Sequence, residues 1–167
     1  FPKGSYSDVE ARVDKYAQSI INMSEIENNK MRFKSAIQSP NYHTDRDVGA
    51  SGVGMAFILM AKQYPDNSIW TESAEQTAAW LLSVAKQDSN GYMHWTDFSN
   101  NDEDSAQAFT SFDDGTIGIG DFFWHLYELT GKNEYRDVYI STLNWTIGAA
   151  TTDPADPNTL YWRYDIN

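Results

Sequence analysis

Cysteine is absent from this chain of 167 residues. Its absence excludes disulfide bonds, thiol nucleophiles and thiolate metal sites. Basic residues are few, because 12 Lys and Arg stand against 24 Asp and Glu for a net charge of −12. A chain this acidic repels nucleic-acid backbones and anionic lipids, so nucleic acid is not an expected partner. No apolar run approaches the roughly 20 residues that cross a bilayer, and we expect no membrane insertion.

The remaining composition is that of a folded domain. Hydrophobic residues make up 41% of the chain and aromatic residues 14%, which at this length is enough to form a core. The chain begins at Phe1 without a methionine and without a charged-then-apolar leader. This start is typical of a mature secreted or cell-surface protein, or of a piece of a longer chain, and we expect one of the two.

Apolar residues recur with helical spacing in several segments. Ser7 and Glu10 have the spacing of a capping box, and the pattern after them predicts a first helix over 8–27. The segment 52–63, "GVGMAFILMAKQ", is apolar nearly all round and predicts a buried helix. A single apolar stripe over 70–85 predicts an amphipathic helix, and the aromatic "YMHWTDF" after it predicts an extended segment.

This order of segments occurs more than once. "DVGASGVG" at 47–54 returns as "DDGTIGIG" at 113–120, and the helical and aromatic segments that follow return with it. Self-similarity at a fixed period, here about 65 residues, indicates a repeat architecture. We therefore expect a single helical repeat domain over 1–167 with five main helices, divided into a half-unit 1–45, a repeat 46–98 and a repeat 112–167.

The glycine cluster that opens a helix, followed by "LYELTGKNEY" and a helix that ends near Trp145, resembles the repeats of lanthionine synthetase C-like proteins. It is also similar to their relatives among the α/α-toroid (six-hairpin) glycosidases, and the resemblance covers about residues 45–150. It implies an all-α fold of toroid-type helical hairpin repeats. Five helices cannot close such a ring, so we expect a partial toroid that belongs to a longer chain or self-associates through its unpaired repeat ends.

The same resemblance argues against the family's chemistry. Lanthionine synthetase C-like enzymes hold a catalytic zinc with two cysteines and a histidine, whereas the matching place here reads Phe112-Asp113-Asp114-Gly115. No zinc ligand carries over, and we expect no metal site and no cofactor. Thioether formation is therefore not an expected activity.

The two glycine clusters allow two interpretations. A phosphate-binding loop would need a basic residue and no neighbouring carboxylates, but Asp47, Asp113 and Asp114 adjoin the glycines and no Gly-Lys-Ser follows. The favoured interpretation is that the glycines let the start of a helix approach its neighbours closely.

Asp113 and Asp114 are the candidate catalytic residues. Two carboxylates that flank a bond can act as general acid and general base, and toroid glycosidases carry acidic residues at the rim where their inner helices begin. The alternative is structural: a carboxylate before a first turn caps the helix.

Four aromatic residues are candidates for substrate binding, because flat rings stack on sugar faces. They lie in the two extended aromatic segments, where the alternative is a wedge in the core between helices: Tyr92, Trp95, Tyr161 and Trp162. His125 lies between Trp124 and Tyr127 on an apolar helix and is expected to be a hydrogen-bonded core histidine.

Two functions remain open on this basis. One is a non-catalytic domain, or one of unknown activity, of the lanthionine synthetase C-like toroid type with a protein partner. The other is a fragment of a carbohydrate-active, glycoside hydrolase-like enzyme that uses the rim aspartates as general acid and base.

Overall fold

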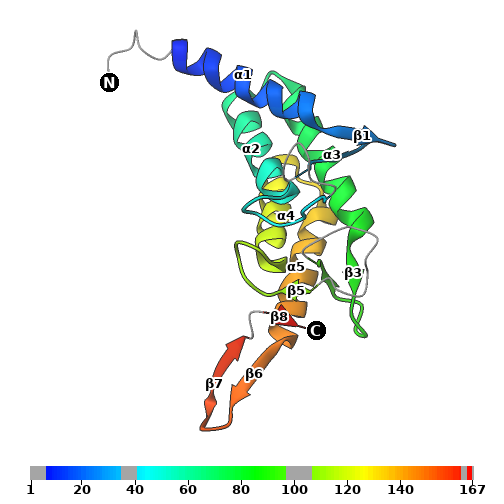
Figure 1. Ribbon diagram of the computed structural model, residues 1–167, viewed down its shortest axis with the longest axis vertical. Coiled ribbons are helices and arrows are strands. Elements are labelled where there is room, and N and C mark those ends of the chain that lie inside the picture. Colours follow the sequence, from blue (N-terminus) through cyan, green and yellow to red (C-terminus); the bar gives the residue numbers. More distant parts are fainter. Residues whose placement is uncertain (1–6, 35–40, 97–106, 163–164, 167) are drawn as a thin grey trace.

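The computed structural model describes residues 7–34, 41–96, 107–162 and 165–166. The described part is mostly helical, with five helices and a few short antiparallel strands (Figure 1). The expected five helices and the mostly helical fold are confirmed, and short strands follow three of the helices. The helices are α1 (Ser7–Met23), α2 (Ala50–Gln63), α3 (Ser68–Val84), α4 (Thr116–Thr130) and α5 (Asn133–Gly148).

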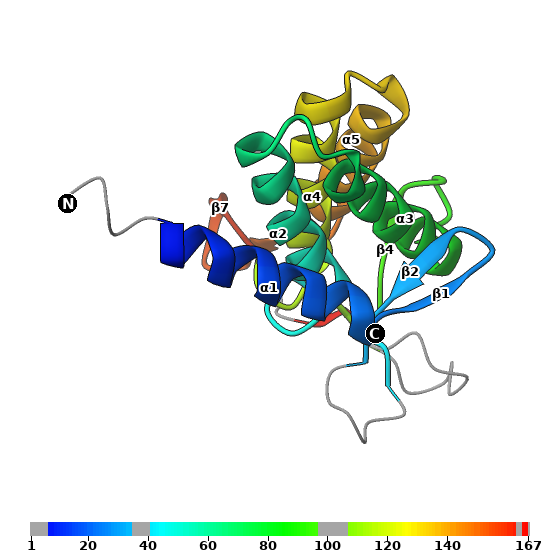
Figure 2. The ribbon, with the colours of Figure 1, turned by 90° about the horizontal axis from the view of Figure 1, so that it is seen from above.

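Two helical hairpins form the body of the molecule. α2 packs along α3, α4 packs along α5, and α2 lies beside α4 (Figure 2). The close approach of α2 and α4 depends on Gly54, because a Cβ atom there would lie 2.5 Å from the ring of Phe122. Aromatic rings fill the space between the helices: Phe57 stacks on Trp70 at 6.3 Å, and Phe122 meets Phe123 edge-on at 5.2 Å.

The helix ends follow local sequence. α3 begins after Asn67, whose side chain accepts a hydrogen bond from the amide of Ile69 at 3.3 Å. α4 ends at Gly131, which adopts φ +71° and donates its amide to the carbonyl of Tyr127 at 2.7 Å. Pro65 follows the end of α2 and cannot continue a helix.

The first helix is shorter than the predicted 8–27. α1 ends at Met23, and β1 (Glu25–Glu27) then pairs with β2 (Lys30–Arg32) in an antiparallel hairpin. Asn28 and Asn29 form its two-residue turn with positive φ angles, which asparagine tolerates better than most residues. The prediction was wrong here because pairing between the two strands outweighed the helical pattern.

A β-hairpin follows each of α1, α3 and α5, and its first strand starts two residues after the helix ends. The second hairpin joins β3 (Lys86–Gln87) to β4 (Met93–His94), and the third joins β6 (Ala150–Asp153) to β7 (Asp156–Trp162). β5 (Ala108–Phe109) pairs with β8 (Asp165–Ile166). The predicted extended aromatic segments thus overlap strands β4 and β7 in part, and their residues 97–98 and 163–164 lie outside the described residues.

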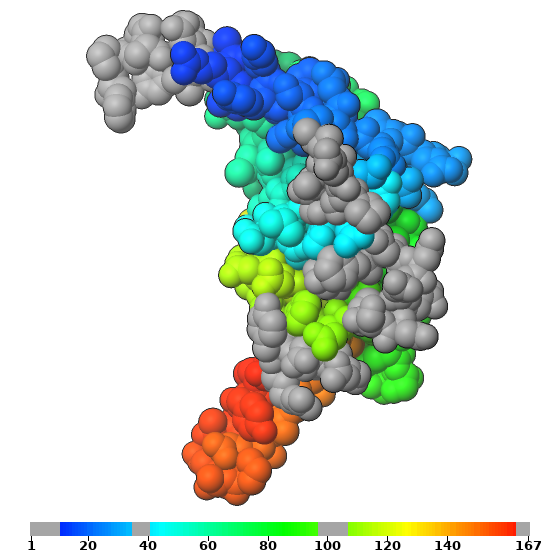
Figure 3. Space-filling view, viewed as in Figure 1, coloured from blue at the N-terminus to red at the C-terminus, as the bar shows by residue number. Residues whose placement is uncertain are grey.

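None of the described helices has both the length and the apolar composition needed to cross a membrane. The molecule is elongated, with α1 at one end of the long axis and the β6–β7 hairpin at the other (Figures 1 and 3).

Candidate functional site

The two glycine clusters lie side by side at the N-terminal ends of α2 and α4. We call the segments 43–49 and 109–115, which precede these helices, the rim loops. The amide of Arg46 in the first loop donates to the carbonyl of Asp113 in the second at 3.0 Å. A main-chain hydrogen bond therefore joins the two rim loops.

The glycines let the main chain of each rim loop fold against the helix that it precedes. A Cβ atom on Gly49 would lie 2.6 Å from the amide nitrogen of Asp45, and one on Gly115 would lie 2.5 Å from the carbonyl oxygen of Phe109. The first amides of α2 are already occupied, since those of Ala50 and Ser51 donate to loop carbonyls at 2.9 and 3.2 Å. These contacts confirm the packing interpretation and leave α2 no open amides for a phosphate.

The candidate catalytic residues lie at the turn of the second rim loop. Asp113 is exposed and Asp114 is half-buried. The amide of Asp114 donates to the hydroxyl of Ser111 at 3.2 Å. In the first loop the amide of Val48 donates to a carboxylate oxygen of Asp45 at 2.8 Å, so the two loops use the same type of turn.

Asp45 is the more buried carboxylate of this rim. Its second oxygen lies 3.5 Å from Nδ1 of His43, and its side chain is almost fully covered. A neighbouring hydroxyl, that of Thr44, donates to the carbonyl of Thr96 at 3.0 Å and joins the loop to the segment that follows β4. These polar contacts give the first rim loop a fixed shape.

A chain of ion pairs and hydrogen bonds runs from the rim loop along α4. Arg46 is paired with Asp121, and Nε2 of His125 lies 3.7 Å from the other oxygen of Asp121. Nδ1 of His125 lies 2.8 Å from Glu128, which in turn is 3.9 Å from Lys62 of α2. The hydrogen bond from His125 lowers the pKa of Glu128. We call these five residues the charge chain.

Sequence reasoning missed the charge chain. The guanidinium of Arg46 also covers the ring of Phe112 at 4.5 Å, which is a contact between residues far apart in sequence. The spacing of Asp121, His125 and Glu128 at i, i+4 and i+7 nevertheless places them on one face of a helix, and this much could be predicted from the sequence. His125 is hydrogen-bonded as predicted, but it is half-exposed, so its expected place in the core is wrong.

The four candidate aromatic residues do not form one surface. Trp95 is only 1% exposed, its indole N–H donates to the carbonyl of Leu81 at 2.8 Å, and its ring stacks on Phe123 at 5.9 Å. Its expected role in a sugar cleft is therefore wrong, and the core-wedge alternative describes it. Tyr92 is half-buried beside β4, while Tyr161 and Trp162 are exposed on β7, which stands out from the body (Figure 3).

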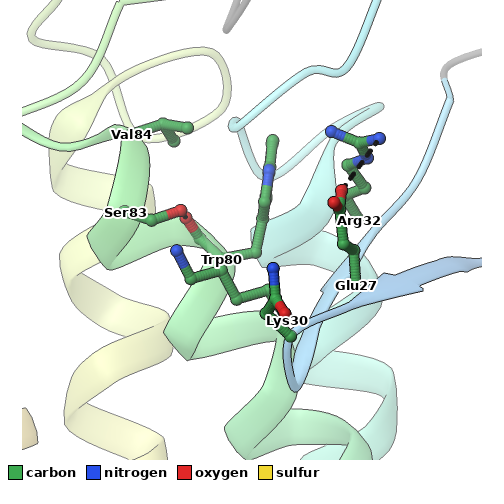
Figure 4. A pocket seen from close by; sticks show the side chains of 7 residues that line it. Glu27, Lys30, Arg32, Trp80, Ser83 and Val84 are labelled. Carbon is green, nitrogen blue, oxygen red and sulfur yellow. Dashed lines mark hydrogen bonds and ion pairs between the residues drawn. The ribbon is translucent and has the colours of Figure 1, made fainter.

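A hollow of about 240 Å³ lies between the β1–β2 hairpin and the C-terminal half of α3. Figure 4 shows Lys30 and Arg32 of β2 across from Trp80 of α3. Arg32 is already paired with Glu25 at 3.1 Å and lies 4.0 Å from Glu27. The hollow therefore lies between two packed elements, and Arg32 on its wall is already ion-paired.

Within the described ranges, no three His, Cys, Asp or Glu side chains gather as metal ligands. In comparisons with known proteins, no protein-family model and no curated protein matches this chain.

Proposed function

We propose that this chain is a section of an α/α-toroid of the lanthionine synthetase C-like type, and that it serves as a non-catalytic interaction domain. Two helical hairpins whose first helices, α2 and α4, lie side by side support this arrangement. The matching rim loops and the hairpin after each second helix also fit a repeated unit. The absence of cysteine excludes the family's zinc ligand set from this chain.

The main support for a non-catalytic role is that the side chains of the charge chain are paired with one another. A general acid or base must be able to exchange its proton with a substrate. Here His125 is held between Asp121 and Glu128, and those carboxylates are themselves paired with Arg46 and Lys62. The titratable side chains along this face of α4 are thus paired with one another, and the pair of Arg46 with Asp121 joins the rim loop to the helix.

One observation favours the alternative, a glycoside hydrolase-like enzyme. Asp113 is exposed at the start of α4, in the position that a rim acid would occupy. The predicted aromatic platform is weaker, however, because Trp95 belongs to the core. We therefore place this function second, with Asp113 and Asp114 as its acid and base.

Hydrolysis of a panel of reducing-end-labelled oligosaccharides separates the two functions. We expect the wild type to release no more product than a buffer blank, and the Asp113→Asn and Asp114→Asn variants to behave identically. Asp47→Asn, at the equivalent place in the other rim loop, is the matched control. Turnover by the wild type that is lost in Asp113→Asn or Asp114→Asn but kept in Asp47→Asn would establish the enzyme instead.

A further inference from the structure

We infer that the hollow between the β1–β2 hairpin and α3 binds a small organic monocarboxylate. Its volume of about 240 Å³ is enough for a ligand of a few carbon atoms. Both of its walls are described elements of this chain, the hairpin on one side and the C-terminal half of α3 on the other (Figure 4). The hollow lies apart from the rim loops, so the inference does not depend on the proposed function.

The wall formed by β2 is basic. Lys30, Arg32 and Lys34 alternate with Met31 and Phe33, which are only 1% and 8% exposed. Because side chains alternate between the two faces of an extended chain, the three cations lie on the face opposite the core. No other stretch of five residues in this sequence carries three basic residues, and the whole chain has a net charge of −12. This wall is therefore an exceptional place for an anion on an acidic protein.

Arg32 is held in a fixed position on this wall. Its Nε and Nη2 atoms donate to one carboxylate oxygen of Glu25 at 3.3 and 3.1 Å. The same oxygen accepts the hydroxyl of Tyr42 at 2.6 Å, and Lys34 lies 2.9 Å from the other oxygen. Hydrogen bonds from Tyr42, Lys34 and Arg32 lower the pKa of Glu25 to about 2, so this carboxyl is ionised at neutral pH. The guanidinium is thus positioned before any ligand arrives.

Lys30 supplies the positive charge that the protein leaves uncompensated. Strand pairing places Glu27 opposite Lys30, but the Glu27 carboxylate lies 4.0 Å from Arg32, and Lys30 joins no ion pair among the described residues. Lys30 is half-buried, and its side chain extends from β2 toward α3 (Figure 4). Lysines that are covered in this way are generally paired. The side chain of Glu27 is 73% exposed, so water screens its repulsion of an anion.

Trp80 adds a buried donor on the other wall. It is only 4% exposed and lines the hollow from α3. The indole N–H of Trp95 donates to the carbonyl of Leu81, whereas the indole N–H of Trp80 has no acceptor among the described residues. Buried polar groups nearly always have a hydrogen-bond partner. An acceptor in the hollow would provide one for Trp80.

These groups together select the chemical class of the ligand. Lys30, Arg32 and Trp80 are donors that cannot accept, so the ligand must offer acceptor atoms. Three cations and the two carboxylates of Glu25 and Glu27 leave one positive charge, which one carboxylate neutralises. A phosphate group, with about two negative charges at neutral pH, would exceed it. Val84 also lines the hollow and offers an apolar contact for a short alkyl stem.

NMR titration with butanoate tests this inference. The 6 tryptophans give separate indole N–H signals in a ¹H–¹⁵N spectrum, and sequential assignment identifies that of Trp80. We expect the Trp80 signal to shift and to saturate with butanoate in the millimolar range. Butanamide has the same shape without the charge and should leave the signal in place. Absence of a shift with butanoate, or an equal shift with butanamide, would overturn the inference.

Two lysine variants locate the site. Lys30→Gln removes the uncompensated ammonium and should weaken butanoate binding about tenfold, as expected for the loss of one charged hydrogen bond. Lys62→Gln removes the same charge from α2, outside the hollow, and should bind like the wild type. The ¹H–¹⁵N spectrum of each variant shows whether it is folded. Equal affinity of folded Lys30→Gln and wild type, or tighter binding of inorganic phosphate than of butanoate, would refute the assignment.

Discussion

The glycines of the rim loops offer a direct test of why the motif occurs twice. Gly118 is the third residue of α4, and a Cβ atom there would overlap the carbonyl oxygen of Phe112 and lie 3.3 Å from Cβ of Arg46. Real Cβ atoms essentially never come within 3.0 Å of a heavy atom. Because the obstacle is main chain rather than a flexible side chain, the rim loop itself would have to move in Gly118→Ala.

The cost of that movement can be set against the gain in helix propensity. Overpacking of this kind costs about 1–3 kcal/mol. Replacing glycine by alanine inside a helix returns at most about 1 kcal/mol. We therefore expect Gly118→Ala to lower the free energy of unfolding by about 1–2 kcal/mol.

Urea unfolding followed by tryptophan fluorescence measures this change. With an m-value of about 2 kcal/mol/M, the midpoint of Gly118→Ala should fall by about 0.5–1 M. Gly148→Ala is the matched control, since Gly148 ends α5 and a Cβ atom there would meet nothing within 4 Å. Its midpoint should stay level or rise slightly. A midpoint for Gly118→Ala at or above that of Gly148→Ala, with equal m-values, would refute the close-packing interpretation.

Two further predictions concern pH. Burial lowers the pKa of His94 below its ordinary value of 6.5, so the unfolded chain binds that proton more readily. The contribution of His94 to the free energy of unfolding should therefore be complete above pH 6.5 and should fall as the pH drops below it. Urea midpoints that fall by the same amount in the wild type and in His94→Asn over this pH range would contradict the prediction. Hydrogen bonds from Tyr42 and Lys34 lower the pKa of Glu25 from 4.5 to about 2, so its contribution is present above pH 4.5 and is lost as the pH falls toward 2. Carboxyl NMR titration should show that Tyr42→Phe raises this pKa, and an ordinary value for Glu25 in the wild type would count against the interaction.

The helices were largely predictable because their signals are local. The segments 52–63 and 70–85 agree with α2 and α3 to within two residues, since apolar periodicity and the Pro65 and Asn67 signals act over a few positions. The end of α1 was not predicted, because β1 exists only through its pairing with β2. The Asn28-Asn29 turn was the local clue to that hairpin.

Of the candidate site, only the glycine clusters could be predicted from the sequence, because they occur twice. The echo of the glycine clusters predicted that helix starts and loops come close, and the contacts at Gly49 and Gly115 confirm it. Arg46 could not be placed from sequence, because its partner Asp121 is brought to it by folding. Trp95 shows the opposite difficulty: an aromatic residue in an extended segment has the same sequence pattern in a core as in a cleft.

The way in which the N-terminus of α2 is capped determines which residues of the first rim loop can be substituted during evolution. Its first amides are held by main-chain carbonyls of His43 and Thr44 rather than by a capping side chain. Substitutions of the exposed Asp47 and Val48 therefore leave the cap in place, provided that the buried Thr44 and Asp45 and the two glycines Gly49 and Gly52 stay. The second loop already carries Phe112 where the first carries Arg46. The rim is thus a surface on which side chains can diverge, or be redesigned for a new ligand, while the backbone keeps its shape.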